Sequence, residues 1–295
     1  MSGEPVAVLG LGLMGRPVAR RLAEQGFAVT GWNRSPLPDD LTEGIALVRE
    51  LADAAAGRGV LVLMLADSAA TGAVLEHLLP HLPAGALVID MGSSEPEDSR
   101  DRARRLAALG AGWVDAPVSG GPGGAERGTL AIMAGGAEHD VERARPLLAA
   151  LGTNVAHVGG PGAGHAMKLV NQVIVGLSIA AVAEALALAA AMGFSVAEVQ
   201  GALRGGSADN AQLRAVGNRI AQREYAPGAR FRTVLKDLRM GADAAEALGL
   251  ALPAVRCARE AGERVIAAGA GEEDCAVLYE LVAADGRLRA GAPGR

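Results

Sequence analysis

A chain of 295 residues, 50% hydrophobic and 21% charged, is long enough for one large or two ordinary domains with a substantial core. Its net charge of −5 argues against nucleic acid as a partner, because a phosphate backbone requires a basic face. Two cysteines, Cys257 and Cys275, are too few for a disulfide framework and fit a reducing compartment, and we interpret both as buried small hydrophobic residues. The first aliphatic run has no basic leader ahead of it, so we expect a cytoplasmic protein without a signal peptide.

The first half of the chain alternates aliphatic runs with amphipathic segments. The expected strands are residues 6–9, 27–32, 59–65, 86–90 and 113–115, and the expected helices are 16–25, 69–79 and 96–109. Continuous aliphatic strands separated by helices indicate a parallel sheet covered on both faces, which predicts a Rossmann-like, doubly wound α/β domain. The arginines of the last of these helices are interpreted as a solvated face: Arg100, Arg102, Arg104 and Arg105.

The second half contains no expected strand after the glycine-rich segment 159–162. Helices are expected at 166–191, 195–203, 211–223, 233–248 and 252–268, with glycine and proline between them. We therefore expect an α/β domain, residues 1–160, joined by a long helix to an all-α domain, residues 161–295. Residues 173–192 of that helix are long and apolar enough to test against a membrane span. A stretch made mostly of alanine with Glu184 inside it favours a buried helix, so no membrane partner is expected.

A glycine pattern, Gly10-Leu11-Gly12-Leu13-Met14-Gly15, follows the first expected strand and opens the first helix. In that context Gly10 permits a tight turn, Gly12 lets the backbone approach a pyrophosphate, and Gly15 allows close packing of helix on strand. The anion would then contact the free amides at the helix N-terminus. The alternative is a glycine-rich turn in an unrelated α/β fold.

The end of the second expected strand indicates which dinucleotide binds. An NAD site has a carboxylate there for the ribose hydroxyls, whereas this chain has Asn33, Arg34 and Ser35. Arg34 can grip a 2′-phosphate in bidentate fashion, and its neighbours can add hydrogen bonds. We therefore expect NADP to be preferred, with NAD possible. A solvated arginine ahead of Pro36 is the alternative.

Ser119, Gly120 and Gly121 follow the fifth expected strand, at the carboxyl end of the sheet where ligands bind in such folds. A serine before two glycines exposes one hydroxyl and consecutive backbone amides, which suits a carboxylate. An ordinary glycine-rich loop is an equal alternative on this motif alone.

Lysine occurs only at Lys168 and Lys236, and every other cationic residue is arginine. Arginine stays protonated at working pH, whereas lysine can exchange a proton, so retention of lysine at two positions points to a chemical role. On a helix, Lys168 and Asn171 project to nearly the same side. Chance survival of two surface lysines is the alternative.

Four ordered motifs resemble the β-hydroxyacid dehydrogenase family, which contains 3-hydroxyisobutyrate dehydrogenase and tartronate semialdehyde reductase and is similar to 6-phosphogluconate dehydrogenase. They are Gly10–Gly15, Asp115–Gly121 with Gly128-Thr129-Leu130, Gly162–Asn171, and Lys236-Asp237-Leu238. The likeness runs from Val6 to at least Ala276, and residues 168–175 and 204–206 most resemble the tartronate semialdehyde reductase branch.

The resemblance implies an oxidoreductase that transfers hydride between NADP and a small β-hydroxy acid or its semialdehyde, working as a homodimer or homotetramer. Residues 1–160 would bind the dinucleotide, residues 161–295 would serve substrate and assembly, and the active site would lie between them. Lys168 would be the general acid/base, Ser119, Gly120 and Gly121 would bind the substrate carboxylate, and Asn171 would orient substrate or Lys168. The remaining implied contacts are to the dinucleotide: Gly10, Leu11, Gly12, Leu13, Met14, Gly15, Asn33, Arg34, Ser35, Met64, Leu65, Ser93 and Lys236.

The chain departs from its relatives at a few positions, with Gln172 in place of a second asparagine and Gly92 in place of a serine. An imine reductase of the same fold is one alternative, but such relatives generally lack the lysine found at Lys168. A non-catalytic dinucleotide-binding module is another. His165 is a competing base, although a surface or hydrogen-bonded structural histidine is favoured. The other histidines have no metal-ligand spacing, so no metal site is expected.

Overall fold

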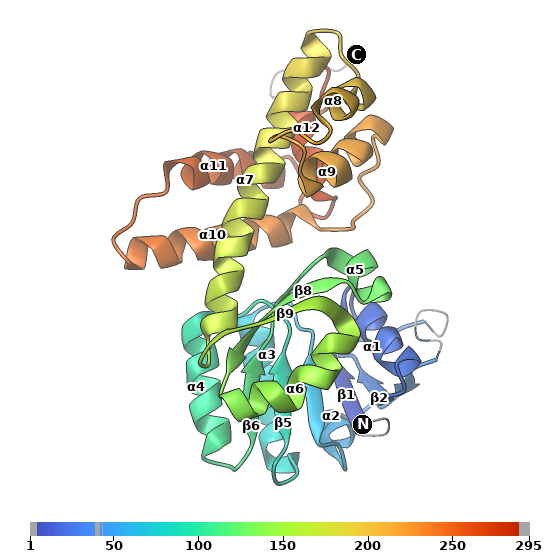
Figure 1. Cartoon of the computed structure of the whole chain (residues 1–295), viewed down its shortest axis with the longest axis vertical. Helices are drawn as coiled ribbons and strands as arrows, with labels where there is room; N and C mark the ends of the chain where they lie inside the picture. Colours follow the sequence, from blue (N-terminus) through green and yellow to red (C-terminus); the bar gives the residue numbers. More distant parts are fainter. Residues whose placement is uncertain (1–4, 39–41, 43, 289–295) are drawn as a thin grey trace. The chain divides into compact units, whose positions relative to one another are not determined.

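The computed structural model describes residues 5–38, 42 and 44–288 (Figure 1). The chain forms two compact units, residues 1–168 and 169–295. The division falls inside one continuous helix, α7 (Ala163–Ala191), which begins just after the boundary expected at residues 160/161. Each unit has its own hydrophobic core and is described separately.

The first unit is built on a nine-stranded sheet of order β3-β2-β1-β4-β5-β6-β8-β7, with β9 pairing β8. The strands are β1 (Pro5–Leu9), β2 (Ala28–Trp32), β3 (Ala46–Leu47), β4 (Val60–Leu63), β5 (Leu87–Asp90), β6 (Gly112–Asp115), β7 (Val118–Ser119), β8 (Leu130–Gly136) and β9 (Gly152–Gly159). The helices are α1 (Gly15–Glu24), α2 (Leu51–Ala55), α3 (Ser68–Leu78), α4 (Pro96–Ala107), α5 (Gly121–Arg127) and α6 (Glu138–Leu151), with a 3₁₀ turn at Leu79–His81. The doubly wound α/β fold is confirmed.

The aliphatic strands form this sheet because both of its faces are buried. Along β1, Val6 and Val8 pack on the face covered by α1 and α6, whereas Ala7 and Leu9 pack on the face covered by α2, α3 and α4. Successive side chains of a strand point to opposite faces, so a strand covered on both sides is apolar at every position. This continuous apolar pattern allowed the central strands to be predicted from the sequence.

The second half of the first unit differs from the expectation of a wholly parallel sheet. Strand β8 runs antiparallel to β6 and β7 and parallel to β9, and none of β7, β8 and β9 was expected. Helices α5 and α6 were missed as well: α5 contains Gly121, Gly123 and Gly124, and α6 contains Pro146, residues that ordinarily count against a helix. Packing of α6 onto the sheet through Val141 and Leu148 outweighs that local preference.

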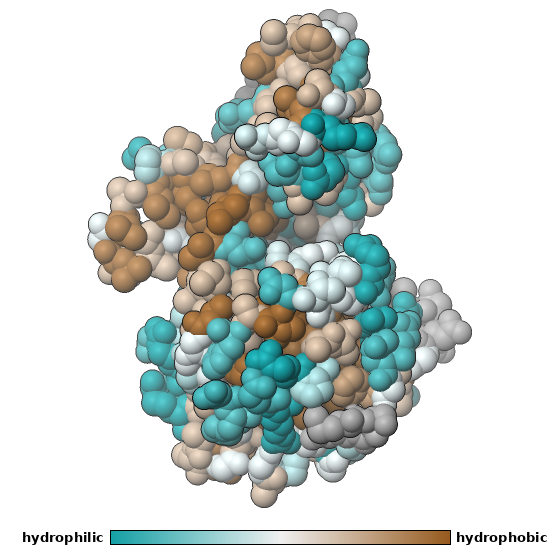
Figure 2. Space-filling model, in the orientation of Figure 1, coloured by the Kyte–Doolittle hydropathy of each residue, from teal (hydrophilic) through white to brown (hydrophobic). Residues whose placement is uncertain are grey.

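The second unit is built of helices, as expected, and its described residues contain no strand apart from an isolated bridge between Arg230 and Asp274. After α7 come α8 (Val196–Leu203), α9 (Ala211–Gln222), α10 (Phe231–Ala247), α11 (Pro253–Ala267), a 3₁₀ turn at Cys275–Leu278, and α12 (Tyr279–Val282). Its core is mainly aliphatic and gathers buried side chains from α7, α9, α10, α11, the 3₁₀ turn and α12, for example Ile179, Leu213, Leu235, Val265 and Leu281. Helix α8 packs against this core through partly buried valines. Figure 2 shows hydrophobic atoms also gathering on the outer surface over α7, α10 and α11.

Helix α7 is long and apolar enough to span a membrane by length and composition, with a mean hydropathy of 2.3 in its most apolar window. Ile179, Val182 and Leu186 of this helix belong to the core of the second unit. These contacts indicate a core helix, the expected interpretation.

Two expectations about single residues were wrong. Cys257 is exposed on α11, and only Cys275 is buried. Arg102 is not on a solvated face but is 6% exposed, with Nη2 donating to the Ser68 carbonyl at 2.5 Å. One arginine of the run therefore ties α4 to the start of α3, while its neighbours Arg100 and Arg104 form exposed pairs with Glu97 and Asp101.

Candidate active site

The glycine turn joins β1 to α1. Gly10 has a φ of +96°, and a Cβ on it would lie 2.5 Å from the Met64 carbonyl oxygen. A Cβ on Gly15 would lie 1.8 Å from the Gly10 carbonyl oxygen, so the helix begins in direct contact with the end of the strand. A Cβ on Gly12 would meet no atom within 4 Å, which leaves that side of the turn open. Each glycine therefore meets the requirement that a dinucleotide turn places on it.

The backbone amides ahead of α1 face the same open side. The amides of Gly12, Leu13 and Met14 have no hydrogen-bond acceptor within the described part of the chain. The start of α1 adds the partial positive charge of a helix N-terminus. The turn therefore fits a pyrophosphate.

Asn33 connects the end of β2 to the glycine turn. Its Oδ1 accepts from the Leu11 amide at 3.0 Å, and its Nδ2 donates to the Ser35 carbonyl at 2.8 Å. The polar atoms of Asn33 thus hold protein backbone, which the sequence did not indicate. The side chains of Arg34 and Ser35 are exposed beside it. No carboxylate occupies the position at which an NAD site would hold the ribose hydroxyls.

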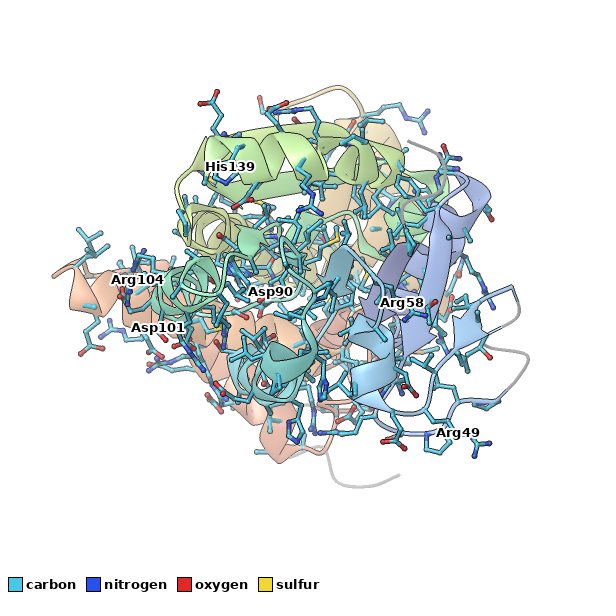
Figure 3. All side chains as sticks on the ribbon, turned by 90° about the horizontal axis from the view of Figure 1, so that it is seen from below. Arg49, Arg58, Asp90, Asp101, Arg104 and His139 are labelled. Atoms are coloured by element: carbon cyan, nitrogen blue, oxygen red, sulfur yellow. The ribbon has the colours of Figure 1, made fainter. Side chains whose placement is uncertain are left out.

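The loops after β4 and β5 approach each other closely. A Cβ on Gly92 would lie 2.8 Å from the Leu65 carbonyl oxygen, so this loop has little room for a larger residue at that position. Asp90 accepts from the Gly92 amide at 3.0 Å and from the Ser94 hydroxyl at 2.9 Å. Figure 3 shows Asp90 in the interior of the first unit, with Arg104 and His139 at its outside. Ser93 is half-buried, like Met64 and Leu65.

The serine–glycine loop lies between β7 and α5. Ser119 is half-buried at the end of β7, and Gly120 and Gly121 are exposed. Both glycines have positive φ, +133° and +64°, so the backbone here takes a course that other residues rarely adopt. The loop presents the Ser119 hydroxyl and the backbone of two glycines, and a Cβ on Gly121 would meet no atom within 4 Å.

Lys168 extends from the second turn of α7 toward this loop. Its Nζ donates to the Val118 carbonyl oxygen at 2.7 Å, and Val118 directly precedes Ser119. The fold therefore brings the lysine of the Gly162–Asn171 motif into contact with Val118 of the Asp115–Gly121 motif, although 50 residues separate the bonded pair.

A buried polar network holds the first turn of α7. Asp115, at the end of β6, accepts from the Gly162 amide at 2.8 Å and from the His165 amide at 3.0 Å. Burial raises the pKa of the Asp115 carboxyl above its ordinary value, and the charge of His165 and the two amides oppose that rise. The His165 ring, 1% exposed, contacts the Ser99 hydroxyl at 2.6 Å and the Gly92 carbonyl at 3.3 Å. His165 is thus buried among hydrogen-bond partners.

The second unit brings Asn171, Gln172 and Asp237 into one chain of contacts. Asn171 Nδ2 donates to Gln172 Oε1 at 2.7 Å, and Gln172 Nε2 donates to Asp237 Oδ2 at 2.5 Å. Lys236 Nζ lies 3.1 Å from the other carboxylate oxygen of Asp237, which is 4% exposed. That oxygen has a charge partner at this distance, although the pair does not meet hydrogen-bond geometry. Gln172, where relatives have asparagine, thus links Asn171 to a buried carboxylate, a role that the sequence did not indicate.

The described residues contain no group of three or more His, Cys, Asp or Glu side chains arranged to hold a metal ion. What they do present is a dinucleotide turn, a serine–glycine loop and a lysine directed at that loop. This combination suits hydride transfer at a carbon whose oxygen must gain or lose a proton.

Comparison with known proteins identifies the family. Residues 5–159 match the family model described as the NAD binding domain of 6-phosphogluconate dehydrogenase. Residues 162–282 match the one described as NAD-binding of NADP-dependent 3-hydroxyisobutyrate dehydrogenase. The chain belongs to the β-hydroxyacid dehydrogenase family.

Similar members of the family align over most of the chain. The 2-hydroxy-3-oxopropionate reductase of Escherichia coli is 35% identical, covering 93% of this chain and 95% of the relative. The NAD-dependent L-serine dehydrogenase of Pseudomonas aeruginosa is 31% identical, covering 94% and 97%. The crystal structure of 3-hydroxyisobutyrate dehydrogenase from Salmonella typhimurium superposes with a TM-score of 0.86 at 29% identity, covering 94% and 99%. As a member of this family, the chain is an NAD(P)-dependent dehydrogenase or reductase acting on hydroxyl groups.

Proposed function

We propose that this enzyme transfers hydride between NADP and a small β-hydroxy acid or its semialdehyde. The compounds we expect are of the tartronate semialdehyde, succinic semialdehyde or glyoxylate, and 3-hydroxyisobutyrate types. The contact between the Lys168 ammonium and the Val118 carbonyl, one residue before Ser119, carries the proposal. The likeness to a 2-hydroxy-3-oxopropionate reductase supports the first of these substrate types.

Lys168 acts as the general acid in reduction and as the general base in oxidation. The bound dinucleotide supplies or accepts the hydride at the substrate carbon. As negative charge grows on the substrate oxygen, the ammonium both stabilises it and donates a proton. The Val118 carbonyl fixes the direction of the ammonium by accepting one of its three N–H bonds.

The serine–glycine loop binds the carboxylate of the substrate. Ser119 offers a hydroxyl, and Gly120 and Gly121 offer backbone amides in a segment free of side chains. We assign to Asn171 the orientation of substrate or of Lys168, and to Lys236 a contact with the cofactor near its nicotinamide. A neutral carbonyl compound without a carboxylate would lack a partner at the loop and should react poorly.

The preference for NADP over NAD is also proposed. It is supported by Arg34, exposed beside the glycine turn, and by the absence of a carboxylate among Asn33, Arg34 and Ser35. One relative is named as an NAD-dependent L-serine dehydrogenase, so we keep NAD as a second cofactor in the proposal. We further propose that the enzyme is cytoplasmic and works as a homodimer or homotetramer.

The test of the function is a spectrophotometric panel of C3–C5 semialdehydes, glyoxylate and β-hydroxy acids with each cofactor, followed by single-turnover hydride transfer in Lys168 variants. Lys168→Ala should lower the rate by about 10²–10⁴, the usual share of general acid–base catalysis. Lys168→Arg should recover little activity, because guanidinium is too basic to release a proton readily.

NADPH binding is the internal control, since the glycine turn and Arg34 are untouched in both variants. A near-wild-type rate of hydride transfer in Lys168→Arg would mean that Lys168 acts only as a fixed positive charge. Near-wild-type transfer by Lys168→Ala would refute the proposal for this residue. A wild-type enzyme inactive on every carboxylate in the panel would refute the substrate class.

A further inference from the structure

The contact of Lys168 with the serine–glycine loop depends on the position of the first turn of α7 relative to the sheet. That turn has no capping side chain of its own, because residues 159–164 supply only glycine, proline and alanine. Its leading amides are instead bonded by a residue from another element, Asp115 at the end of β6. One carboxylate oxygen takes the Gly162 amide and the other takes the His165 amide.

The backbone around Asp115 leaves the helix no room to shift inward. A Cβ on Gly164 would lie 2.3 Å from the Asp115 carbonyl oxygen and 2.4 Å from the Met133 carbonyl oxygen. A Cβ on Gly135, in β8, would lie 2.5 Å from the Gly164 amide nitrogen. The first turn of α7 therefore rests directly on β6 and β8, and the carboxylate of Asp115 sets its position along them.

The His165 side chain makes a second set of contacts that hold the same turn. The His165 ring extends back to the loop after β5 and to α4, where it meets the Gly92 carbonyl and the Ser99 hydroxyl. The Gly92 carbonyl can only accept, so it pairs with an N–H at Nε2, and the Ser99 hydroxyl is within hydrogen-bond distance of Nδ1. Both ring nitrogens also lie 3.9 Å from a buried carboxylate, Nε2 from Asp90 and Nδ1 from Asp115.

We propose that Asp115 and His165 are positioning residues for the reaction, holding α7 so that the Lys168 ammonium meets the serine–glycine loop. We call Asp115, His165 and Ser99 the helix anchor. This positioning role rests on the proposed function, because it presupposes that Lys168 is the proton donor. Neither residue touches substrate in this scheme, and His165 is not the acid or base.

Asp115→Asn tests the hydrogen bonds of Asp115 without changing the size of its side chain. It keeps the volume of the side chain, but a neutral amide has one oxygen and can accept from only one of the two backbone amides. Because the two backbone amides bond different oxygens of Asp115, one of them would face the NH₂ group of asparagine, and the first turn should move or fray. Lys168 should then lose its fixed contact with the Val118 carbonyl.

The lysine content provides a readout that needs no substrate. With Lys168 and Lys236 as the only lysines, acetylation by sulfosuccinimidyl acetate can be followed at both by mass spectrometry, Lys236 serving as internal reference. In Asp115→Asn the ratio of Lys168 to Lys236 acetylation should rise about three- to tenfold, the change expected when one hydrogen bond is lost. Single-turnover hydride transfer should fall by about tenfold or more while NADPH affinity stays unchanged.

Asp274→Asn is the matched control. Asp274 is also a buried aspartate, 2% exposed, that accepts from the backbone amides of Gly228, Ala229 and Ala276, but it belongs to the second unit and makes no hydrogen bond to the first turn of α7. It should lower stability to a similar extent and leave the acetylation ratio unchanged. An equal rise in both variants would mean that general loosening, not the helix anchor, exposes Lys168, and would overturn the proposal.

A folded Asp115→Asn protein with an unchanged ratio would also overturn it. Should that variant fail to fold, Ser99→Ala tests the other arm of the anchor, since it removes only the hydroxyl on His165 Nδ1. A smaller rise in the ratio is expected there, and no rise would count against the proposal. If the wild type has no activity on the substrate panel while the ratio still rises in Asp115→Asn, the proposed function fails and the anchor stands.

Discussion

At the scale of single residues, Arg34 decides the expected cofactor preference. Arg34→Ala should lower kcat/KM with NADPH by about tenfold and leave NADH nearly unaffected, because one charge-assisted contact to the 2′-phosphate is worth about 1.4 kcal/mol. Steady-state kinetics with both cofactors measure this, and Arg49→Ala, also an exposed arginine of the first unit, is the control. Equal losses with both cofactors would contradict the assignment.

The two cysteines should differ sharply in reactivity. Burial, and then the neighbouring Asp274 carboxylate, raises the pKa of Cys275 to about 12, whereas Cys257 is exposed. Because the thiolate is the nucleophile, Cys275 should be inert at neutral pH. Titration with Ellman's reagent should give one fast thiol in the native protein and two after unfolding. Cys257→Ser should remove the fast one, and two fast native thiols would refute the burial of Cys275.

Sequence motifs led to the residues that carry local signals, and failed for those whose role comes from a distant partner. Lys168 stood out by composition and Gly10–Gly15 by spacing after a strand. Asp115 was noticed only as the start of a motif, because its bonds join it to amides about 50 residues away. The polar atoms of Asn33 hydrogen-bond the backbone of Leu11 and Ser35, a local geometry that spacing does not reveal, and its contact with the cofactor stays a prediction.

At the scale of elements, glycines inside helices should respond in opposite ways according to what surrounds them. Gly164→Ala, in α7, should lower the free energy of unfolding by about 1–3 kcal/mol, because its Cβ would press on two backbone carbonyls. Gly201→Ala, in α8, should raise it by about 0.4–1 kcal/mol, since a Cβ there meets nothing within 4 Å and alanine reduces the entropy of the unfolded chain. Chemical denaturation measures both, and equal shifts would contradict the packing at Gly164.

The elements that the sequence predicted are those in which burial and local preference agree. The strands β1, β4 and β5 are aliphatic at nearly every position and are covered on both faces. Strand β8 ends in Gly135 and Gly136, and β9 is half-exposed with polar residues, so neither shows the pattern of a buried strand. Their pairing depends on contacts between residues that are distant in the sequence, and hydrophobic periodicity does not detect such contacts.

At the scale of the whole molecule, exposed apolar side chains along α7 support the proposed assembly. Val170 is 55% exposed, Ile174 62% and Leu188 63% on a helix with few polar positions. Covering them with a second copy of the chain would remove this surface from water. We expect a dimer or tetramer at micromolar concentration by light scattering.

Ile174→Glu should weaken that assembly by about tenfold or more in its dissociation constant, because it would bury a charge in an apolar contact. Leu109→Glu, at a residue 56% exposed just after α4, is the control and should leave the mass unchanged. A wild-type protein that is monomeric at micromolar concentration would contradict the assembly.

Lys168, which donates to the Val118 carbonyl, and Lys236, which forms an ion pair with Asp237, are the only lysines of the sequence, so the proton of the proposed donor is directly observable. Selective ¹⁵N labelling of lysine side chains would give a spectrum with only two ammonium resonances in the whole enzyme. Each would be assigned by a single substitution, and hydrogen-bonded ammonium protons exchange slowly enough with water to be followed. Proton transfer in an unaltered enzyme could thus be monitored by nuclear magnetic resonance as substrate and cofactor are added.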